Sequence, residues 1–230
     1  MIIGITGFIG SGKDTVANYL VAQHGFQRDS FAGTLKDAVA QVFGWDRQLL
    51  EGLTPEARIW REQVDPWWAN RLGMPNLTPR HMLQLWGTEV CRQGFHDDIW
   101  IASLENRLRR TKTNTVISDV RFPNEIQTIR KNGGICIWVT RGALPEWYNC
   151  AFQENTTHDD SQWLLEDAEQ LMPQRYPGVH HSEWAWIGQQ FDYQIDNNGS
   201  VPQLYSKINS LLQDLQVSNL TGSQPTLPDN

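Results

Sequence analysis

The stretch Gly-Phe-Ile-Gly-Ser-Gly-Lys-Asp at residues 7–14 decides the fold. Before it, residues 2–6 form an apolar run with β-branched side chains, which predicts a short buried strand. After it, residues 13–24 carry apolar side chains at helical spacing, and Gly25 is suited to end that helix. A glycine turn that joins a strand to a helix, with a lysine after its last glycine, is the context that a phosphate-binding P-loop requires.

The chemistry of this turn is electrostatic. Successive backbone N–H groups and the N-terminus of the following helix converge on a phosphate group. Gly10 and Gly12 permit positive φ and a close approach, and Lys13 supplies a charge for the β- and γ-phosphates. We therefore expect ATP to bind here, through Gly10, Ser11, Gly12, Lys13, Asp14 and Thr15. The alternative is a tight turn without a ligand.

Asp14 departs from the usual P-loop pattern, in which Ser or Thr follows the lysine and binds magnesium. A carboxylate binds Mg²⁺ directly or through water. We therefore expect Asp14 to take over the magnesium role and Thr15 to donate to the α-phosphate. The alternative is an acid that only complements the dipole of the helix.

Composition excludes several classes of protein. The 26 acidic and 19 basic residues give a net charge of −7, which does not suit a non-specific nucleic-acid or membrane-surface binder. The three cysteines form no CxxC pair, which favours a reducing compartment over a disulfide or zinc framework. The apolar runs are shorter than the roughly 18 residues of a membrane helix, and the N-terminus reads as part of the fold and not as a signal peptide. We expect a cytoplasmic protein without nucleic-acid or membrane partners.

The rest of the chain predicts a parallel sheet with helices on both faces, because near-continuous apolar strands alternate with helical patterns. Further strands are expected at 26–31, 115–118, 135–140 and 192–196. Further helices are expected at 34–43, after Thr54, after Thr78, after Asp97 or Asp98, and at 123–132 and 201–215, with Pro66 ending or kinking the helix that starts at Thr54.

Several segments, in order along the chain, resemble the phage deoxynucleoside monophosphate kinases. Gly12–Thr15 resembles the P-loop of that family, and Arg80–Glu89 resembles its Arg-x-x-x-Gln-x-x-Gly-Thr-Asp/Glu helix. Ile117–Glu125 resembles its strand-end Asp-x-Arg motif. The remaining matches are Phe31–Asp37, His181–Glu183 and Asp196–Ser200. The resemblance runs discontinuously from residue 1 to about 215 and leaves 142–180 unmatched.

The resemblance implies a P-loop NTPase of the nucleoside monophosphate kinase type, with a parallel sheet of about five strands. It implies transfer of the γ-phosphoryl group of ATP to a deoxynucleoside monophosphate, which gives dNDP and ADP. The cofactors are then ATP and Mg²⁺, and the partners are the two nucleotides. The resemblance places the protein in the host cytoplasm if its source is viral, and it leaves a homodimer open.

Phosphoryl transfer depends on positioning and on cations rather than on covalent help from the protein. We assign Lys13 to the donor phosphates, and Lys36, Arg80 and Arg121 to the acceptor phosphate or its neighbourhood. Arg121 follows a strand end, at the edge of the sheet where ligands bind in open α/β folds. Asp119, at the same strand end, suits a magnesium-water or acceptor role. The expected catalytic set is Lys13, Asp119 and Arg121.

Each assignment outside the loop has a structural alternative. Lys36 would be a solvated first-turn lysine, Arg80 would pair with a surface acid such as Asp97, Arg121 would pair with Glu125, and Asp119 would cap a helix. Gln84 or Glu89 is expected to read the base edge and Trp86 to stack on it, or else Trp86 is a core aromatic. Asn198 follows the last strand, where related kinases place adenine, or else lies in a plain turn.

We expect a single kinase domain over 1–216, with a helical acceptor-binding region at 45–112 and an irregular, lid-like insertion at 142–190. Residues 217–230 are expected to form a flexible tail. Two other functions remain open. One is a P-loop kinase of another metabolite, of the dephospho-coenzyme A or phosphomevalonate type, and the other is a nucleotide-binding regulatory module without kinase activity.

Overall fold

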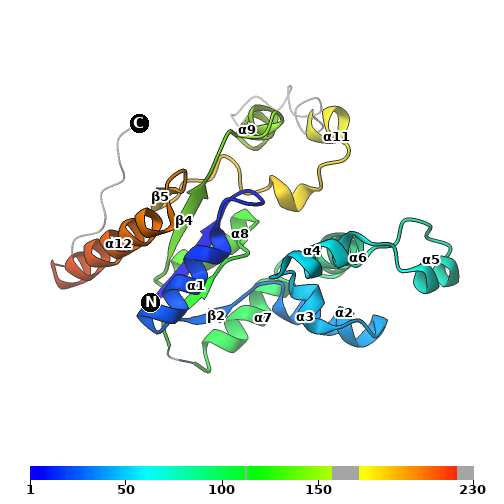
Figure 1. Cartoon of the computed structure of the whole chain (residues 1–230), viewed down its shortest axis with the longest axis horizontal. Helices are drawn as coiled ribbons and strands as arrows, with labels where there is room; N and C mark the ends of the chain where they lie inside the picture. Colours follow the sequence, from blue (N-terminus) through cyan, green and yellow to red (C-terminus); the bar gives the residue numbers. More distant parts are fainter. Residues whose placement is uncertain (112, 157–170, 222–230) are drawn as a thin grey trace. The chain divides into compact units, whose positions relative to one another are not determined.

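The computed structural model describes residues 1–111, 113–156 and 171–221, and in the last helix it describes side chains as far as Gln216 (Figure 1). The chain forms two compact units. The sheet unit comprises Met1–Arg28 and Thr113–Asn230, and the helical unit comprises Asp29–Lys112. The helical region expected at 45–112 lies inside the helical unit, which starts earlier in the chain.

The sheet has five strands in the order β2 (Gln27–Asp29), β3 (Thr115–Ile117), β1 (Ile2–Thr6), β4 (Ile135–Thr140) and β5 (Tyr193–Asp196). Strand β1 pairs in parallel with β3, where Ile3 lies opposite Val116. It also pairs in parallel with β4, where Ile3 lies opposite Ile135, and β4 pairs in parallel with β5. The prediction of a five-stranded parallel α/β sheet is confirmed.

Successive residues of β1 point to opposite faces of the sheet, and their burial shows how both faces are covered. Ile3 and Ile5 are fully buried in a core that they share with residues of α1 (Lys13–His24) and α12 (Val201–Thr221). Gly4 points to the opposite face, because successive residues of a strand alternate. A Cβ at Gly4 would lie 2.4 Å from Cδ1 of Ile129 on α8 (Pro123–Lys131). The absence of a side chain at Gly4 therefore lets α8 pack close to the sheet.

Two predictions about the sheet unit need correction. Helix α12 continues through Thr221, beyond Gln216, where the tail was expected to begin. The segment 142–190 is partly helical, with α9 (Tyr148–Thr156), α11 (Leu171–Arg175) and a 3₁₀ turn at His181–Glu183, while its residues 157–170 lie outside the described part. These helices are too short to show a clear apolar period in the sequence.

The helical unit is built from short helices with strong start signals. These are α2 (Gly33–Phe43), α3 (Arg47–Glu51), α4 (Pro55–Glu62), α5 (Pro66–Leu72), α6 (Pro79–Leu85), the π-helix η1 (Trp86–Gln93) and α7 (Ile99–Leu108). The hydroxyls of Thr54 and Thr78 accept from the backbone N–H groups of Ala57 and His81, as the sequence predicted. A core that includes Leu35, Leu50 and Leu77 holds the helices together.

One predicted helix boundary in this unit is wrong. Helix α2 begins at Gly33, one residue before its predicted start, and Thr34 Oγ1 bonds with Ser103 Oγ at 2.8 Å and accepts from Arg107. Pro66 begins α5 instead of ending the preceding helix, which stops at Glu62. Proline suits the first helical position because the missing N–H would have no partner there. Within the described residues, no helix combines the length and the apolar character needed to cross a membrane.

Candidate functional site

The loop between β1 and α1 depends on glycine at several positions. Gly7, Gly10 and Gly12 have φ values of 143°, 80° and 100°, a region that side chains disfavour. A Cβ at Gly7 would lie 2.3 Å from the carbonyl oxygen of Val139, and one at Gly12 would lie 2.3 Å from Nδ2 of Asn197. The loop therefore has the backbone freedom that the sequence predicted, and close neighbours fix its shape.

Lys13 opens α1 and folds back over the loop. Its Nζ donates to the carbonyl oxygens of Gly7 at 2.6 Å and Phe8 at 2.8 Å. Burial, and then the positive charge of Arg121, lower the pKa of Lys13 from 10.5 to about 8, although Asp14 and Glu183 act in the opposite direction. Lys13 and Arg121 therefore act on each other as like charges. Two such cations would complement a polyanion such as a polyphosphate.

Two further groups shape the loop. The Ser11 hydroxyl oxygen is buried and has no hydrogen-bond partner within the described part of the chain. A buried hydroxyl without a partner is costly, and an anion on the loop would supply one. Nδ2 of the buried Asn197 donates to the Ser11 carbonyl oxygen at 2.8 Å. Sequence reasoning chose Asn198 instead, but that side chain is exposed and accepts from Gly142 N–H at 2.7 Å.

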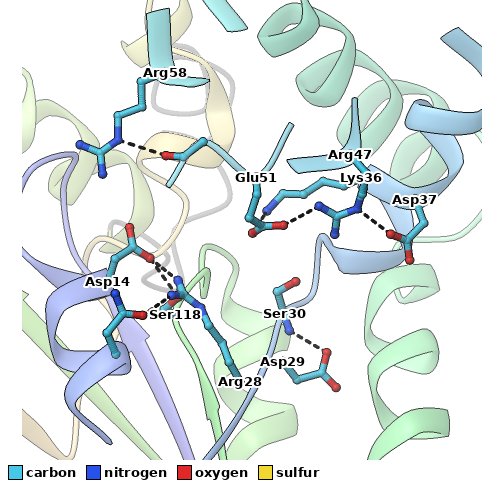
Figure 2. A network of polar contacts seen from close by, with 12 residues as sticks. Asp14, Arg28, Asp29, Ser30, Lys36, Asp37, Arg47, Glu51, Arg58 and Ser118 are labelled. Carbon is cyan, nitrogen blue, oxygen red and sulfur yellow. Dashed lines mark hydrogen bonds and ion pairs between the residues drawn. The ribbon is translucent and has the colours of Figure 1, made fainter. Parts of the chain in front are cut away.

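Asp14 lies in the first turn of α1 and forms an ion pair with Arg28 on β2 (Figure 2). The Arg28 guanidinium also donates to Ser118 Oγ at 2.7 Å and to Asn18 Oδ1 at 2.9 Å. Sequence reasoning missed Arg28, for which the signal was a charged residue inside a short predicted strand. Thr15 follows Asp14 in the same turn and is partly buried.

Arg121 follows β3, as predicted, but its ion-pair partner differs from the expected alternative. Its Nη1 donates to Glu183 Oε1 at 2.8 Å and approaches the carbonyl oxygen of Ser182 at 3.3 Å. The Glu125 carboxylate instead accepts from the backbone N–H of Arg121 at 2.8 Å. Burial disfavours the charge of Arg121, but Glu183, Asp119 and Glu125 outweigh it and raise the pKa of Arg121. Asp119 therefore acts electrostatically on Arg121 in the structure.

The candidates in the helical unit have carboxylate partners. Lys36 Nζ donates to Glu51 Oε1 at 2.6 Å, and Arg47 bonds to both Glu51 and Asp37 (Figure 2). Burial of Glu51 raises its pKa, but Lys36 and Arg47 outweigh burial and lower it from 4.5 to about 2. The Lys36 side chain is only 12% exposed, so the alternative of a solvated lysine is wrong.

The remaining candidates of the helical unit lie on α6 and η1. Arg80 pairs at 3.2 Å with the exposed carboxylate of Glu62, a surface acid of the kind that the expected alternative named, and Asp97 pairs with the buried Arg92. Gln84 is partly buried at the end of α6, and Glu89 is exposed on η1. The ring of Trp86 packs edge-on against Phe43 at 5.5 Å, at the margin of the core. A π-helix such as η1 is rare and occurs often at functional sites.

The strand β1, the glycine loop, Lys13 and the helix α1 together define a P-loop protein, and Arg121, whose charge acts on Lys13, suits the kinase branch of that class. A family model described as deoxynucleotide monophosphate kinase matches residues 68–151. A curated protein of Acanthamoeba polyphaga mimivirus, provisionally named a deoxynucleotide monophosphate kinase, is 34% identical over 158 residues, which cover 63% of this chain and 76% of that protein. The chain therefore belongs to the deoxynucleotide monophosphate kinase family.

Other relatives share shorter or weaker similarity. The deoxynucleoside-5′-monophosphate kinase of Escherichia phage T5 is 46% identical over 56 residues, which cover 24% of this chain and 22% of that protein. The solved shikimate kinase of Aquifex aeolicus is 13% identical, with a TM-score of 0.41 over 97% of this chain and 100% of that chain. A gluconokinase of Sinorhizobium meliloti is 15% identical, with a TM-score of 0.39 over 96% and 97%. These two structures do not bear on the activity. The sequence relatives confirm the predicted family and its assignment to the phosphotransferases.

Proposed function

We propose that this protein is an ATP-dependent kinase that transfers the γ-phosphoryl group to a deoxynucleoside monophosphate and releases dNDP and ADP. Membership of the family supports the acceptor class. The observation that carries the donor side is the glycine loop between β1 and α1, with positive φ at Gly7, Gly10 and Gly12 and with Lys13 Nζ bonded to the carbonyl oxygens of Gly7 and Phe8. Such an arrangement suits the triphosphate of ATP.

The proposed chemistry rests on positioned charges. Lys13 and Arg121 would contact phosphoryl oxygens, on which negative charge is spread in the transition state. Arg121 is a fixed cation, because its carboxylate partners raise its pKa. Lys13 is mostly charged at neutral pH with a pKa of about 8, and an anion beside it would raise that pKa further. Asp119 is proposed to hold Arg121 in the correct place or to bind a water on the acceptor side.

The residues around Asp14 fit a magnesium ion. Mg²⁺ keeps several waters and binds through one or two carboxylates together with substrate phosphates. Within the described residues, no group of three or more His, Cys, Asp or Glu forms a protein-only metal cage. Asp14, with a half-exposed carboxylate in the first turn of α1, would supply the oxygen ligand. When bound, Mg²⁺ would neutralise charge on the β- and γ-phosphates. Arg28 holds the Asp14 carboxylate in place and would have to share it with the ion.

On the acceptor side we propose that Lys36 and Arg80 bind the phosphate of the monophosphate. Gln84, Glu89 and Trp86 would then recognise its base, and Asn198 would lie near the adenine of ATP. Glu51 and Glu62 partly neutralise the two cations, so the phosphate would share each of them with a carboxylate. The viral origin of the relatives supports a site of action in the host cytoplasm.

A coupled assay of ADP formation tests the proposal. Purified protein would receive Mg-ATP with each of the four deoxynucleoside monophosphates, the four ribonucleoside monophosphates, dephospho-coenzyme A and phosphomevalonate. We expect ADP only with one or more deoxynucleoside monophosphates, and the dNDP product would be identified by chromatography. Turnover with dephospho-coenzyme A or phosphomevalonate alone would instead identify a metabolite kinase. A lack of acceptor-dependent ADP with every compound would indicate a nucleotide-binding module.

A further inference from the structure

Phe8, inside the glycine loop, contacts aromatic side chains far away in the sequence. Its ring centroid lies 4.9 Å from that of Trp186, 5.5 Å from that of Trp147 and 6.1 Å from that of Tyr148. The contacts with Trp147 and Tyr148 are edge-on. The next loop residue, Ile9, is 70% exposed. The side chain of Phe8 therefore attaches the loop to this aromatic cluster, whereas the side chain of Ile9 is exposed.

The cluster is a firm support because its members pack on one another. Trp186 is only 3% exposed, and its ring lies 5.7 Å from that of Trp138 on β4. Tyr148 stacks on the same Trp138, with planes 7° apart. Aromatic pairs in such geometry contribute about 0.5–1.5 kcal/mol each beyond their buried area. The ring of Phe8 is therefore held by neighbours that the sheet itself anchors.

The backbone of Phe8 holds two groups of the loop. Its carbonyl oxygen accepts from Ser11 N–H at 3.1 Å and from Lys13 Nζ at 2.8 Å. A shift of the Phe8 ring would move this carbonyl, and with it the turn and the ammonium group that face the ligand. Binding is tightest when such groups are held in their bound geometry beforehand.

We propose that Phe8 is a positioning residue for the phosphate-binding loop, held by the cluster of Trp147, Tyr148 and Trp186, so that these three described side chains help to set the affinity for the triphosphate. This inference rests on the proposed function, because ATP is taken as the ligand of the loop. It gives part of the predicted lid-like segment a definite task, which is to support the loop from the side.

Phe8→Leu tests the inference, since leucine keeps an apolar side chain but removes the ring. We expect the ATP dissociation constant, measured by calorimetry, to rise about tenfold, which matches the loss of one to three ring contacts. The KM for ATP should rise by a similar factor while kcat changes less than threefold. Phe8→Tyr, which restores a ring, should recover most of the affinity. The matched control is Phe191→Leu, because Phe191 contacts Trp138 and Trp186 in the same cluster but makes no ring contact with Phe8.

A double-mutant cycle with Trp147→Leu separates positioning from general destabilisation. Trp147 lies outside the loop, yet its loss should also weaken ATP binding, and the double variant should bind no worse than the weaker single variant. Additive effects, or Phe8→Leu and Phe191→Leu losing the same affinity, would overturn the inference. Wild-type protein is titrated first. If it does not bind ATP, the proposed function fails. If it binds and Phe8→Leu binds equally well, only the positioning role fails.

Discussion

Lys13 and Lys36 both lie in the first turn of a helix, but the two units of the molecule surround them differently. In the sheet unit, Lys13 donates to two neutral backbone carbonyls, and the charge of another cation, Arg121, lowers its pKa. In the helical unit, Lys36 donates to the carboxylate of Glu51, which Arg47 also binds. Neutral partners leave a net positive charge for an anion, whereas a carboxylate cancels it. Lys13 is therefore a cation that is available for an anion, whereas Lys36 also holds the helices α2 and α3 together.

Lys13→Ala should have the largest effect of the changes considered, a fall in kcat of about 10²–10³-fold, because it removes a charge from the reacting phosphates. The free energy of unfolding should change little, since a buried amine with a lowered pKa is costly to keep charged. Kinetic assays and chemical denaturation measure the two quantities. Lys36→Ala is the matched control and should leave the ATP dissociation constant unchanged. Equal losses of ATP affinity in both variants would show that Lys13 and Lys36 do not differ in their role towards ATP.

Arg121→Ala should lower kcat about hundredfold and should also move the pH profile. The charged form of Lys13 binds phosphate, so kcat/KM for ATP should fall as the pH rises through about 8. Removing the neighbouring cation raises the pKa of Lys13, so the alkaline limb should shift to higher pH. Initial rates between about pH 6 and 10 would show the shift. An unmoved limb would mean that Arg121 does not act on Lys13.

Glu51→Gln should affect stability in the helical unit and should cost about 2 kcal/mol at neutral pH, since two cations lose their shared carboxylate. The folded-state pKa of Glu51, about 2, lies below its ordinary 4.5. Its contribution is therefore complete above about 4.5 and is lost as the pH falls towards 2. Urea denaturation at several pH values should show the difference from wild type shrinking in acid. Asp37→Asn, at a more exposed carboxylate, should cost less than half as much.

Asn197→Ala should give the smallest effect, a rise of about fivefold in the ATP dissociation constant, because one hydrogen bond to the loop is lost. Asn198→Ala next to it tests the proposed adenine contact, and a change of less than twofold in this constant would contradict that contact. Calorimetry on the two variants distinguishes support of the loop by Asn197 from the adenine contact proposed for Asn198. A larger loss at position 198 would favour the adenine contact.

The parts of the structure that are set by residues close together in the sequence could be predicted. The strand at 2–6, the glycine loop and the helix at 13–24 follow from local spacing, and the caps at Thr54 and Thr78 follow from side chains three residues from their partners. The partners of the charged side chains were harder to find. Arg28 bonds to Ser118, and Arg121 bonds to Glu183, across 90 and 62 residues of sequence. No local pattern encodes such pairs, so Glu183 was missed as the ion-pair partner of Arg121.

The helical unit leaves and rejoins the sheet unit at a single place. The chain departs after Arg28 and returns at Thr113. Just before the departure, Gln27 N–H donates to the carbonyl oxygen of Asn114 at 2.8 Å, and Thr113 Oγ1 donates to Oε1 of Gln27 at 2.9 Å. Insertions whose two ends lie together are those that a host fold tolerates best. A short turn that joined Arg28 to Thr113 would therefore remove the helical unit together with Asp29, the last residue of β2, and would leave the central strand β1, the glycine loop and the aromatic support of Phe8 on one continuous chain.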